Sequence, residues 1–381
     1  MADLHLCASA DKMAARPTAS RVNTMPANTE TALPDSITEL LRTSGAALRV
    51  FDMGRRISKL SQDQFRRIED SQLAYPTPFQ HLAWLALLIW NPKRKQENAV
   101  WFLRLPLDEQ GLIAPAARDD LLNRLIQNVI NSKNGQLDED ALKDNPYSFT
   151  PEQSRMAAFH ALAAREMQSP ASPHYERTQA WFSAQLPLDA WQTLAYQGLA
   201  DFIMRLDQDG NAQALRHRLP EMPAAVLETL CPLLEHVKPG PALQAELEQQ
   251  LQQSLTGTDS NRVAALCRAL SNITDEAAKQ HLVLDVLATP HALEPEVVTV
   301  IATRCDSALM APKVLQVFLE RLAEGKAGQI GFSRILAELM FMPVHRALIL
   351  QAFRNPERSE CLSQAIGEMF GQSFATPTDT H

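Results

Sequence analysis

The chain has 381 residues, which is more than one ordinary hydrophobic core needs and suggests two domains or an array of repeats. Hydrophobic residues make up 45% of the chain and charged residues 21%, a balance that excludes a disordered protein. The net charge of −8 argues against sequence-independent binding of nucleic acid over the whole surface. With 13 glycines and 24 prolines, the composition predicts helices joined by proline-marked turns.

The cysteines form no C-x-x-C pair, and they are Cys7, Cys231, Cys267, Cys305 and Cys361. An odd number without pairing motifs argues against a disulfide framework and a zinc site, and it predicts a location in the reducing cytoplasm. No segment reaches the roughly 20 apolar residues that a membrane span requires, since the longest run, 82–90, is about half that length. We therefore expect no membrane association.

Both ends of the chain are interpreted as disordered tails. Residues 1–34 lack hydrophobic periodicity and contain no apolar segment that could serve as a secretory signal. Within them, Met25 is a candidate for the biological start. Residues 371–381 are interpreted in the same way as a C-terminal tail.

Folded structure is expected from about residue 35. The segment 36–45 predicts a capped helix that ends at a glycine. The segment 47–61 is interpreted as one strand with a bend at Gly54, because apolar residues, Val50, Phe51, Met53 and Ile57, lie among basic ones. A short helix capped by Ser61 follows.

The next apolar segment, 81–90, can be interpreted in two ways. Its alanines and leucines favour a helix, whereas its two tryptophans, its flanking prolines and its length favour a strand buried on both faces. The segment 98–107 predicts a strand more clearly, and the charged connector KRKQEN, 93–98, would then join an antiparallel pair. Together these elements predict a small α+β module over 35–113.

From residue 114 onward the sequence predicts helices and no strand. The segment 115–131 begins with a proline and carries apolar residues at helical spacing. A second helix is predicted over 150–168 with Thr150 as its cap, and a third over 188–206 with Asp189 as its cap. These belong to a helical segment that we place at residues 114–222.

A period is visible in the last part of the chain. Cys231, Cys267 and Cys305 lie 36 and 38 residues apart in similar apolar helical surroundings, with partner helices between them. Helix pairs at this spacing predict an α-helical, HEAT-like solenoid over 223–370, so the fold class is mainly α with a small N-terminal α+β module. The periodic positions indicate small core residues and not nucleophiles.

Three segments together resemble an uncharacterised family of gammaproteobacterial proteins that is known only as a domain of unknown function. They are FDMGRRISK at 51–59, WLALLIWN at 84–91 and WFLRLPLDEQGL at 101–112. The resemblance implies helical proteins with such an N-terminal module and would cover nearly everything from about residue 36. It implies no activity and assigns no catalytic residue.

Positive charge is concentrated near the N-terminal module. Between Arg49 and Arg104 the chain has ten Lys or Arg and five Asp or Glu, a local balance of +5 in a protein of net charge −8. A solvated face is the simpler interpretation of such a cluster. Contact with phosphates through Arg55, Arg56, Arg66, Arg67 and Lys93 to Lys95 is the alternative.

Two adjacent carboxylates, Asp108 and Glu109, follow the strand predicted over 98–107, together with Gln110. Neighbouring side chains on a strand or turn point apart, so we interpret them as a solvated turn. The alternative is a charged site in which Arg55 or Arg56 lies beside Asp108 or Glu109 across one small sheet.

The sequence contains no motif for a bound cofactor or metal. No phosphate-binding glycine loop, nucleophile elbow or dinucleotide-binding fingerprint occurs, and the ten histidines form no metal-binding pair. We therefore expect no cofactor, no metal ligand and no catalytic residue.

The leading hypothesis is a cytoplasmic scaffold or adaptor that binds another protein through the N-terminal module and the concave face of the array. One alternative is a factor that binds nucleic acid or the ribosome through the basic patch. A second alternative is an enzyme with a carboxylate and arginine site near Asp108 and Glu109. The candidate interaction surface comprises Asp52, Arg55, Arg56, Arg66, Arg67, Asp108, Glu109 and Gln110.

Overall fold

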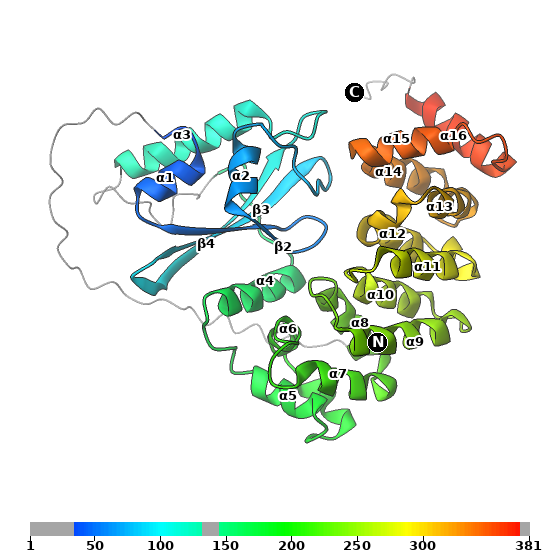
Figure 1. Ribbon diagram of the computed structural model, residues 1–381, viewed down its shortest axis with the longest axis horizontal. Helices are drawn as coiled ribbons and strands as arrows, with labels where there is room; N and C mark the ends of the chain where they lie inside the picture. Colours follow the sequence, from blue (N-terminus) through cyan, green and yellow to red (C-terminus); the bar gives the residue numbers. More distant parts are fainter. Residues whose placement is uncertain (1–33, 132–144, 374–381) are drawn as a thin grey trace, which may run out of the picture.

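The computed structural model of the chain describes residues 34–131 and 145–373, a small sheet with flanking helices beside a long stack of helices (Figure 1). The first part contains α1 Ile37–Thr43, β1 Ala47–Asp52, β2 Ser58–Leu60, α2 Gln62–Glu69, β3 Leu82–Asn91, β4 Arg94–Pro106 and α3 Pro115–Asn131. The second contains α4 Gln153–Glu166, α5 Tyr175–Phe182, α6 Tyr196–Met204, α7 Asn211–Arg218, α8 Ala224–Leu234, α9 Pro241–Leu255, α10 Ser260–Leu270, α11 Glu276–Leu287, α12 Pro295–Arg304, α13 Pro312–Glu324, α14 Gly328–Met340, α15 Pro343–Ala352 and α16 Glu360–Ser373. Short 3₁₀ helices lie at Leu188–Thr193, Leu219–Glu221, Pro290–Leu293 and Asp306–Met310. The prediction of a mainly α fold with a small α+β part near the N-terminus is confirmed.

The sheet is antiparallel throughout, with the strand order β2-β1-β3-β4. β1 and β2 form a hairpin in which Val50 pairs with Leu60 and Asp52 pairs with Ser58. The prediction of one bent strand over 47–61 is therefore wrong. The chain reverses because the Asp52 carboxylate accepts a hydrogen bond from the backbone N–H of Gly54, at 3.1 Å, and closes a turn there.

β3 resolves the ambiguity over 81–90 as a strand that is buried on both faces. Ala83 and Leu85 face a core shared with α1, α2 and α3, whereas Ala86 and Leu88 face a core shared with the later helices. Because both faces are covered, the apolar run is continuous and does not alternate with polar residues. α3 thus packs with the sheet, although it lies beyond the predicted limit of the module at residue 113.

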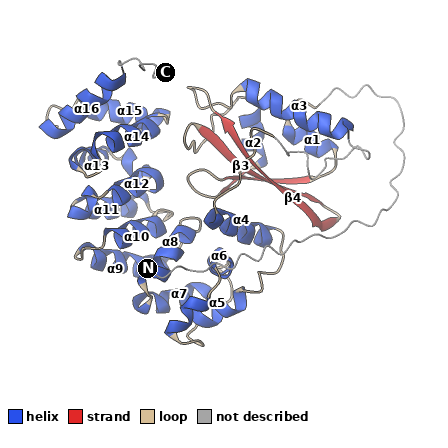
Figure 2. Cartoon of the chain, turned by 180° about the vertical axis from the view of Figure 1, so that it is seen from behind, coloured by secondary structure: helices blue, strands red, loops and turns tan. Residues whose placement is uncertain are grey.

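Helices cover the two faces of the sheet from different parts of the chain. α1, α2 and α3 lie on one side and α4 on the other (Figure 2). On the α4 side, the ring of Phe159 makes edge-to-face contacts with Phe51 at 5.4 Å and with Phe102 at 5.2 Å. Such aromatic pairs stabilise packing beyond the area that they bury. The sheet is therefore held against the helical part by a continuous apolar contact.

The hairpin of β3 and β4 is tighter than the sequence predicted. β4 begins at Arg94, which pairs with Asn91, so most of the residues placed in a connector over 93–98 belong to the strand. The Asn91 side chain accepts a hydrogen bond from the Lys93 N–H at 3.0 Å. An asparagine that bonds two residues ahead forms its own turn, which shortens the connection.

Two predicted helix caps are confirmed and two are wrong. Ser36 caps α1, and Ser61 caps α2 within a complete capping box. α4 begins at Gln153 and not at Thr150, because the two residues after Thr150 remain outside the helix. The helix predicted over 188–206 is interrupted, since Leu194 adopts an extended conformation between a 3₁₀ helix and α6.

Helices α8–α16, called the array below, form two layers. α8, α10, α12 and α14 pack against one another in succession and make an inner layer that faces the sheet (Figure 1). α9, α11 and α13 make the outer layer. Cys231, Cys267 and Cys305 are buried in the array, and burial raises the pKa of all three thiols, so the prediction of core cysteines is confirmed.

The predicted tails fall almost entirely outside the described residues. Residues 1–33, with the candidate start Met25, and residues 374–381 are not described. α16 continues through Ser373, so the first residues of the predicted C-terminal tail are helical. Among the helices of 34–131 and 145–373, none combines the length and apolar character needed to cross a membrane.

Candidate interaction cleft

The turn between β1 and β2, Met53–Ile57, is called the β1–β2 loop. Its shape is set by Asp52, whose carboxylate accepts hydrogen bonds from the Tyr75 hydroxyl at 2.5 Å and from the Thr77 hydroxyl at 2.8 Å. Burial raises the pKa of Asp52 to about 6, although the hydrogen bonds from Tyr75, Thr77 and Gly54 lower it. The loop is thereby fixed to the segment that leads into β3.

Gly54 permits this close approach. A Cβ atom at Gly54 would lie 3.2 Å from the Asp52 Oδ1, 3.3 Å from the Phe79 Cβ and 3.3 Å from the Thr77 carbonyl oxygen. On the other side, the guanidinium of Arg155, from α4, donates to the carbonyl oxygens of Met53 and Gly54. The loop is therefore held between α4 and the chain before β3.

Arg55 extends from the loop into the array and is buried, with only 5% of its side chain exposed. Its Nε donates to the Pro78 carbonyl oxygen at 3.0 Å and its Nη1 to the Ala302 carbonyl oxygen at 3.3 Å. Its Nη2 forms an ion pair with Glu338 of α14 at 2.9 Å. A buried arginine requires such partners, because an unpaired charge inside a protein is strongly destabilising.

Arg56 and Ile57 contact the neighbouring helices. The Arg56 guanidinium donates to the Asn272 side chain at 3.3 Å, to the Ser271 carbonyl and hydroxyl oxygens at 3.3 and 3.2 Å, and to the Arg304 carbonyl oxygen at 3.1 Å. The Ile57 N–H donates to His236 Nδ1 at 3.1 Å. Burial lowers the pKa of His236 to about 3, so the ring is neutral at pH 7 and can accept this bond.

The acceptors share one structural position. Ser271 is the C-cap of α10, Arg304 is the last residue of α12, and His236 follows the end of α8. The last carbonyl groups of a helix have no partner within it and carry partial negative charge, so they attract guanidinium groups. Three consecutive loop residues thus contact the ends of four successive inner helices.

A buried carboxylate joins those helix ends. Glu235 is 1% exposed and accepts from Arg268 Nε at 2.8 Å and from Arg304 Nε at 2.9 Å. Burial alone would raise the pKa of Glu235, but the positive charges of Arg304 and Arg268 outweigh it and lower that pKa to about 2. The group therefore stays ionised and links α8, α10 and α12.

A cleft of about 350 Å³ opens between the β1–β2 loop and the inner helices. Its lining includes Arg56 and Lys59 from the sheet part, Glu166 from α4, and Lys238, Asn272 and Asp306 from the array. The volume lies in the range of ordinary ligand sites. The cleft is open, and its lining combines apolar side chains such as Phe51, Ile57 and Leu162 with charged ones, so it can receive a side chain or an extended segment of another molecule.

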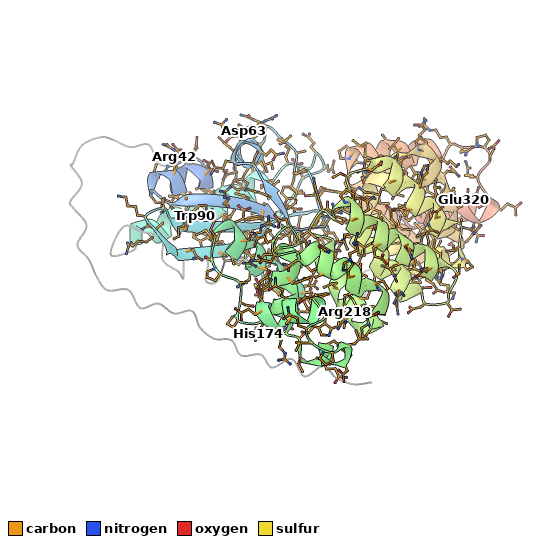
Figure 3. The ribbon with its side chains drawn as sticks, turned by 60° about the horizontal axis from the view of Figure 1, so that its bottom comes forward. Arg42, Asp63, Trp90, His174, Arg218 and Glu320 are labelled. Carbon is orange, nitrogen blue, oxygen red and sulfur yellow. The ribbon has the colours of Figure 1, made fainter. Side chains whose placement is uncertain are left out.

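The residues proposed as one interaction surface do not form one. Asp52 and Arg55 are buried, and Arg56 is half-buried with its guanidinium bound to the array. Asp52 and Arg55 cannot lie on a free surface because their polar atoms have partners inside the protein. Arg66 and Arg67 are exposed on α2, where Arg66 pairs with Asp63 at 3.2 Å, and Asp63 lies at the outer margin of the molecule (Figure 3).

Asp108, Glu109 and Gln110 form a turn. The Asp108 side chain accepts from the N–H groups of Gln110 and Leu112, both at 2.9 Å, and Gly111 adopts a φ of +79°. Glu109 and Gln110 are exposed. The hydrogen bonds of Arg55 and Arg56 lead to the array, so the arginine–carboxylate site of the second alternative is not formed.

Sequence reasoning missed the array side of the cleft. His236, Asn272, Arg304 and Glu338 lie on helix ends, and none belongs to a local motif. One signal was available, because Lys238, Asn272 and Asp306 follow one another at intervals of 34 residues. Such spacing is what stacked helix pairs would give to equivalent turns.

No group of three or more His, Cys, Asp or Glu within 34–131 and 145–373 is arranged to hold a metal ion. Comparisons with curated proteins and with solved structures gave no significant match. A family model described as "Protein of unknown function (DUF3549)" matches residues 34–370. This confirms the resemblance to a domain-of-unknown-function family. The chain belongs to that family.

Proposed function

We propose that this protein is an interaction scaffold, in which the array is a HEAT-like solenoid and the cleft beside the β1–β2 loop receives another protein. The observation that carries the proposal is the contact of Arg55, Arg56 and Ile57 with successive inner helices. Solenoids bind extended segments along a row of equivalent positions, and the loop already occupies part of such a row.

The repeat spacing supports the solenoid. Inner helices α8, α10, α12 and α14 pack in order, and the outer helices lie between successive members of that layer in the sequence. Equivalent turns at 34-residue intervals present Lys238, Asn272 and Asp306 to the same cleft. A partner lying in the cleft would therefore contact several repeats at once.

The nucleic-acid alternative loses part of its proposed contact surface. Arg55 and Arg56 serve the internal contact, so of the residues proposed for this function Arg66, Arg67 and Lys93–Lys95 remain exposed. Binding through these residues would depend steeply on salt concentration. Nuclease treatment therefore separates the two functions in one experiment.

The test is affinity capture from nuclease-treated lysate of the native cell, with the full chain as bait. Thr303→Trp places a large uncharged side chain in the cleft, because Thr303 lines it. We expect the wild type to capture a stoichiometric protein that Thr303→Trp does not. Thr256→Trp is the matched control, since Thr256 is exposed at the end of α9 and its hydroxyl likewise bonds a backbone carbonyl.

Capture that is equal for wild type and Thr303→Trp would contradict the proposal. Recovery of a partner from untreated lysate that is lost after nuclease treatment would also contradict it, and would favour binding of nucleic acid through the basic patch. Urea unfolding of both variants checks that the substitutions leave the fold intact, so a loss of capture reports on the cleft.

A further inference from the structure

The array side of the cleft carries a row of three side chains with different charge. Lys238 follows α8, Asn272 follows α10 and Asp306 follows α12, and successive members of this row are 34 residues apart in the sequence. All three line the same cleft. The row therefore runs from a cation through a neutral amide to a carboxylate along the direction in which the inner helices stack.

The cationic end has charge available for a ligand. Lys238 is exposed and has no ion-pair or hydrogen-bond partner among the described residues. Arg56 lies in the middle of the row, where its guanidinium bonds the Asn272 side chain and the Arg304 carbonyl oxygen; it donates only to neutral oxygens, so no carboxylate offsets its charge. Lys59 contributes less, because Glu166 lies 3.1 Å from its ammonium. The Glu235 carboxylate does not offset this end, since it already has two arginine partners.

The anionic end is similarly open. The Asp306 carboxylate has no Lys or Arg partner within the described residues, and the His345 ring lies 4.0 Å from it. About a quarter of the Asp306 side chain is exposed, at 26%. A partly desolvated carboxylate at the rim of a cleft attracts a Lys or Arg of a partner more strongly than one in bulk water.

The distance between the two ends selects an extended ligand. Packed helices lie about 10 Å apart, so two steps along the inner layer separate Lys238 from Asp306 by about 20 Å. An extended chain advances about 3.3 Å per residue, so about six residues span that distance. Neither a small anion nor a small cation could satisfy both ends.

We infer that the cleft binds an extended peptide segment of a partner protein that carries acidic residues at one end and basic residues about six positions away. The acidic side chains face Lys238 at one end of the row, and the basic ones face Asp306 at the other. This assignment rests on the proposed function, because it names the class of segment that the scaffold receives. Complementary charge at both ends also fixes the register of the segment along the array.

The test uses synthetic, capped, fluorescein-labelled peptides and the full chain, with fluorescence anisotropy at low salt. The parent peptide has two glutamates, a four-residue Ser/Thr spacer and two lysines. In the acidic-only peptide both lysines are replaced by glutamine, and in the basic-only peptide both glutamates are replaced by glutamine. We expect the parent to bind about fivefold more tightly than either, as the loss of one exposed ion pair predicts.

The variants assign the two ends separately. Lys238→Glu should weaken the parent and the acidic-only peptide by about tenfold and leave the basic-only peptide unchanged. Asp306→Lys should do the reverse. Lys313→Glu and Glu357→Lys are the matched controls, because both residues are exposed and neither lines the cleft. They should leave binding of every peptide unchanged.

The inference is overturned if no peptide binds, if the single-charge peptides bind as tightly as the parent, or if Lys238→Glu and Asp306→Lys have no effect. Its failure can be distinguished from failure of the proposed function. A partner whose capture is lost in Thr303→Trp but kept in both charge variants leaves the scaffold in place and removes the charge assignment. If Thr303→Trp and both charge variants all still capture the partner, the scaffold proposal itself fails.

Discussion

Asp52 is fully buried yet ionised at neutral pH, and this has a measurable cost. Its pKa rises from the ordinary 3.8 to about 6, chiefly through burial. A carboxyl whose pKa is higher in the folded protein than in the unfolded chain makes the folded state less stable as pH rises through that interval. The contribution of Asp52 to stability therefore falls between about pH 4 and about pH 6.

Asp52→Asn should remove this pH-dependent contribution to stability and leave the conformation of the β1–β2 loop unchanged. The asparagine oxygen can accept from Tyr75 and Gly54, and its amide can donate to the Thr77 hydroxyl. We expect the unfolding free energy of the variant minus that of the wild type to increase by up to about 3 kcal/mol as pH rises through this window. Urea unfolding of both proteins across pH 4 to 7 measures it, and a difference independent of pH would contradict the assignment.

The helix ends depend on Glu235, which joins three elements of the inner layer. Its pKa is lowered to about 2, so its contribution to stability is present above about pH 4.5 and is lost as pH falls toward 2. Removing one partner of a buried ion pair leaves the other charge without compensation. The positions of α8, α10 and α12 therefore rest partly on one carboxylate.

Glu235→Gln should destabilise the protein by about 3 kcal/mol at pH 7, because Arg268 and Arg304 lose their carboxylate partner. Glu324→Gln is the control, since Glu324 pairs with Arg321 at the surface and should cost less than about 1 kcal/mol. Chemical unfolding at pH 7 compares the two variants. Equal losses would mean that Glu235 does not join the helices.

Elements governed by local chemistry could be predicted from the sequence. The caps at Ser36 and Ser61 use hydrogen bonds within three residues, so a short window contains the whole signal. The apolar run of β3 predicted burial on both faces if it was a strand, but its helix-forming residues left the choice open until its pairing with β1 and β4 was known. The interrupted helix at 188–206 shows tertiary packing overriding a favourable local pattern.

The cleft could not be predicted in this way, because its contacts join distant parts of the chain. Arg55 meets Ala302 across 247 residues and Glu338 across 283 residues. The sequence marks both loop arginines as charged and therefore favours a solvated position. Only the folded chain brings the helix ends to them, and their carbonyl groups then replace water as the partners.

At the scale of the whole molecule, the sheet and the array are joined by both apolar and polar contacts. One hydrophobic core runs from β1 and β3 through α4 into the array, and the β1–β2 loop adds hydrogen bonds at the helix ends. The sequence separated a module from a repeat array, whereas the packing unites them. The cleft exists because the two parts meet without filling the space beside the loop.

The most direct measurement of the scaffold proposal is hydrogen–deuterium exchange of the full chain, alone and with the partner obtained by capture. We expect slower exchange on binding in the β1–β2 loop and β2, and in the turns that carry Lys238, Asn272 and Asp306. The same regions should show no change in Thr303→Trp. Protection confined to α2 and the hairpin end at Lys93–Lys95, with the cleft unaffected, would contradict the central claim and place the binding surface on the exposed basic residues.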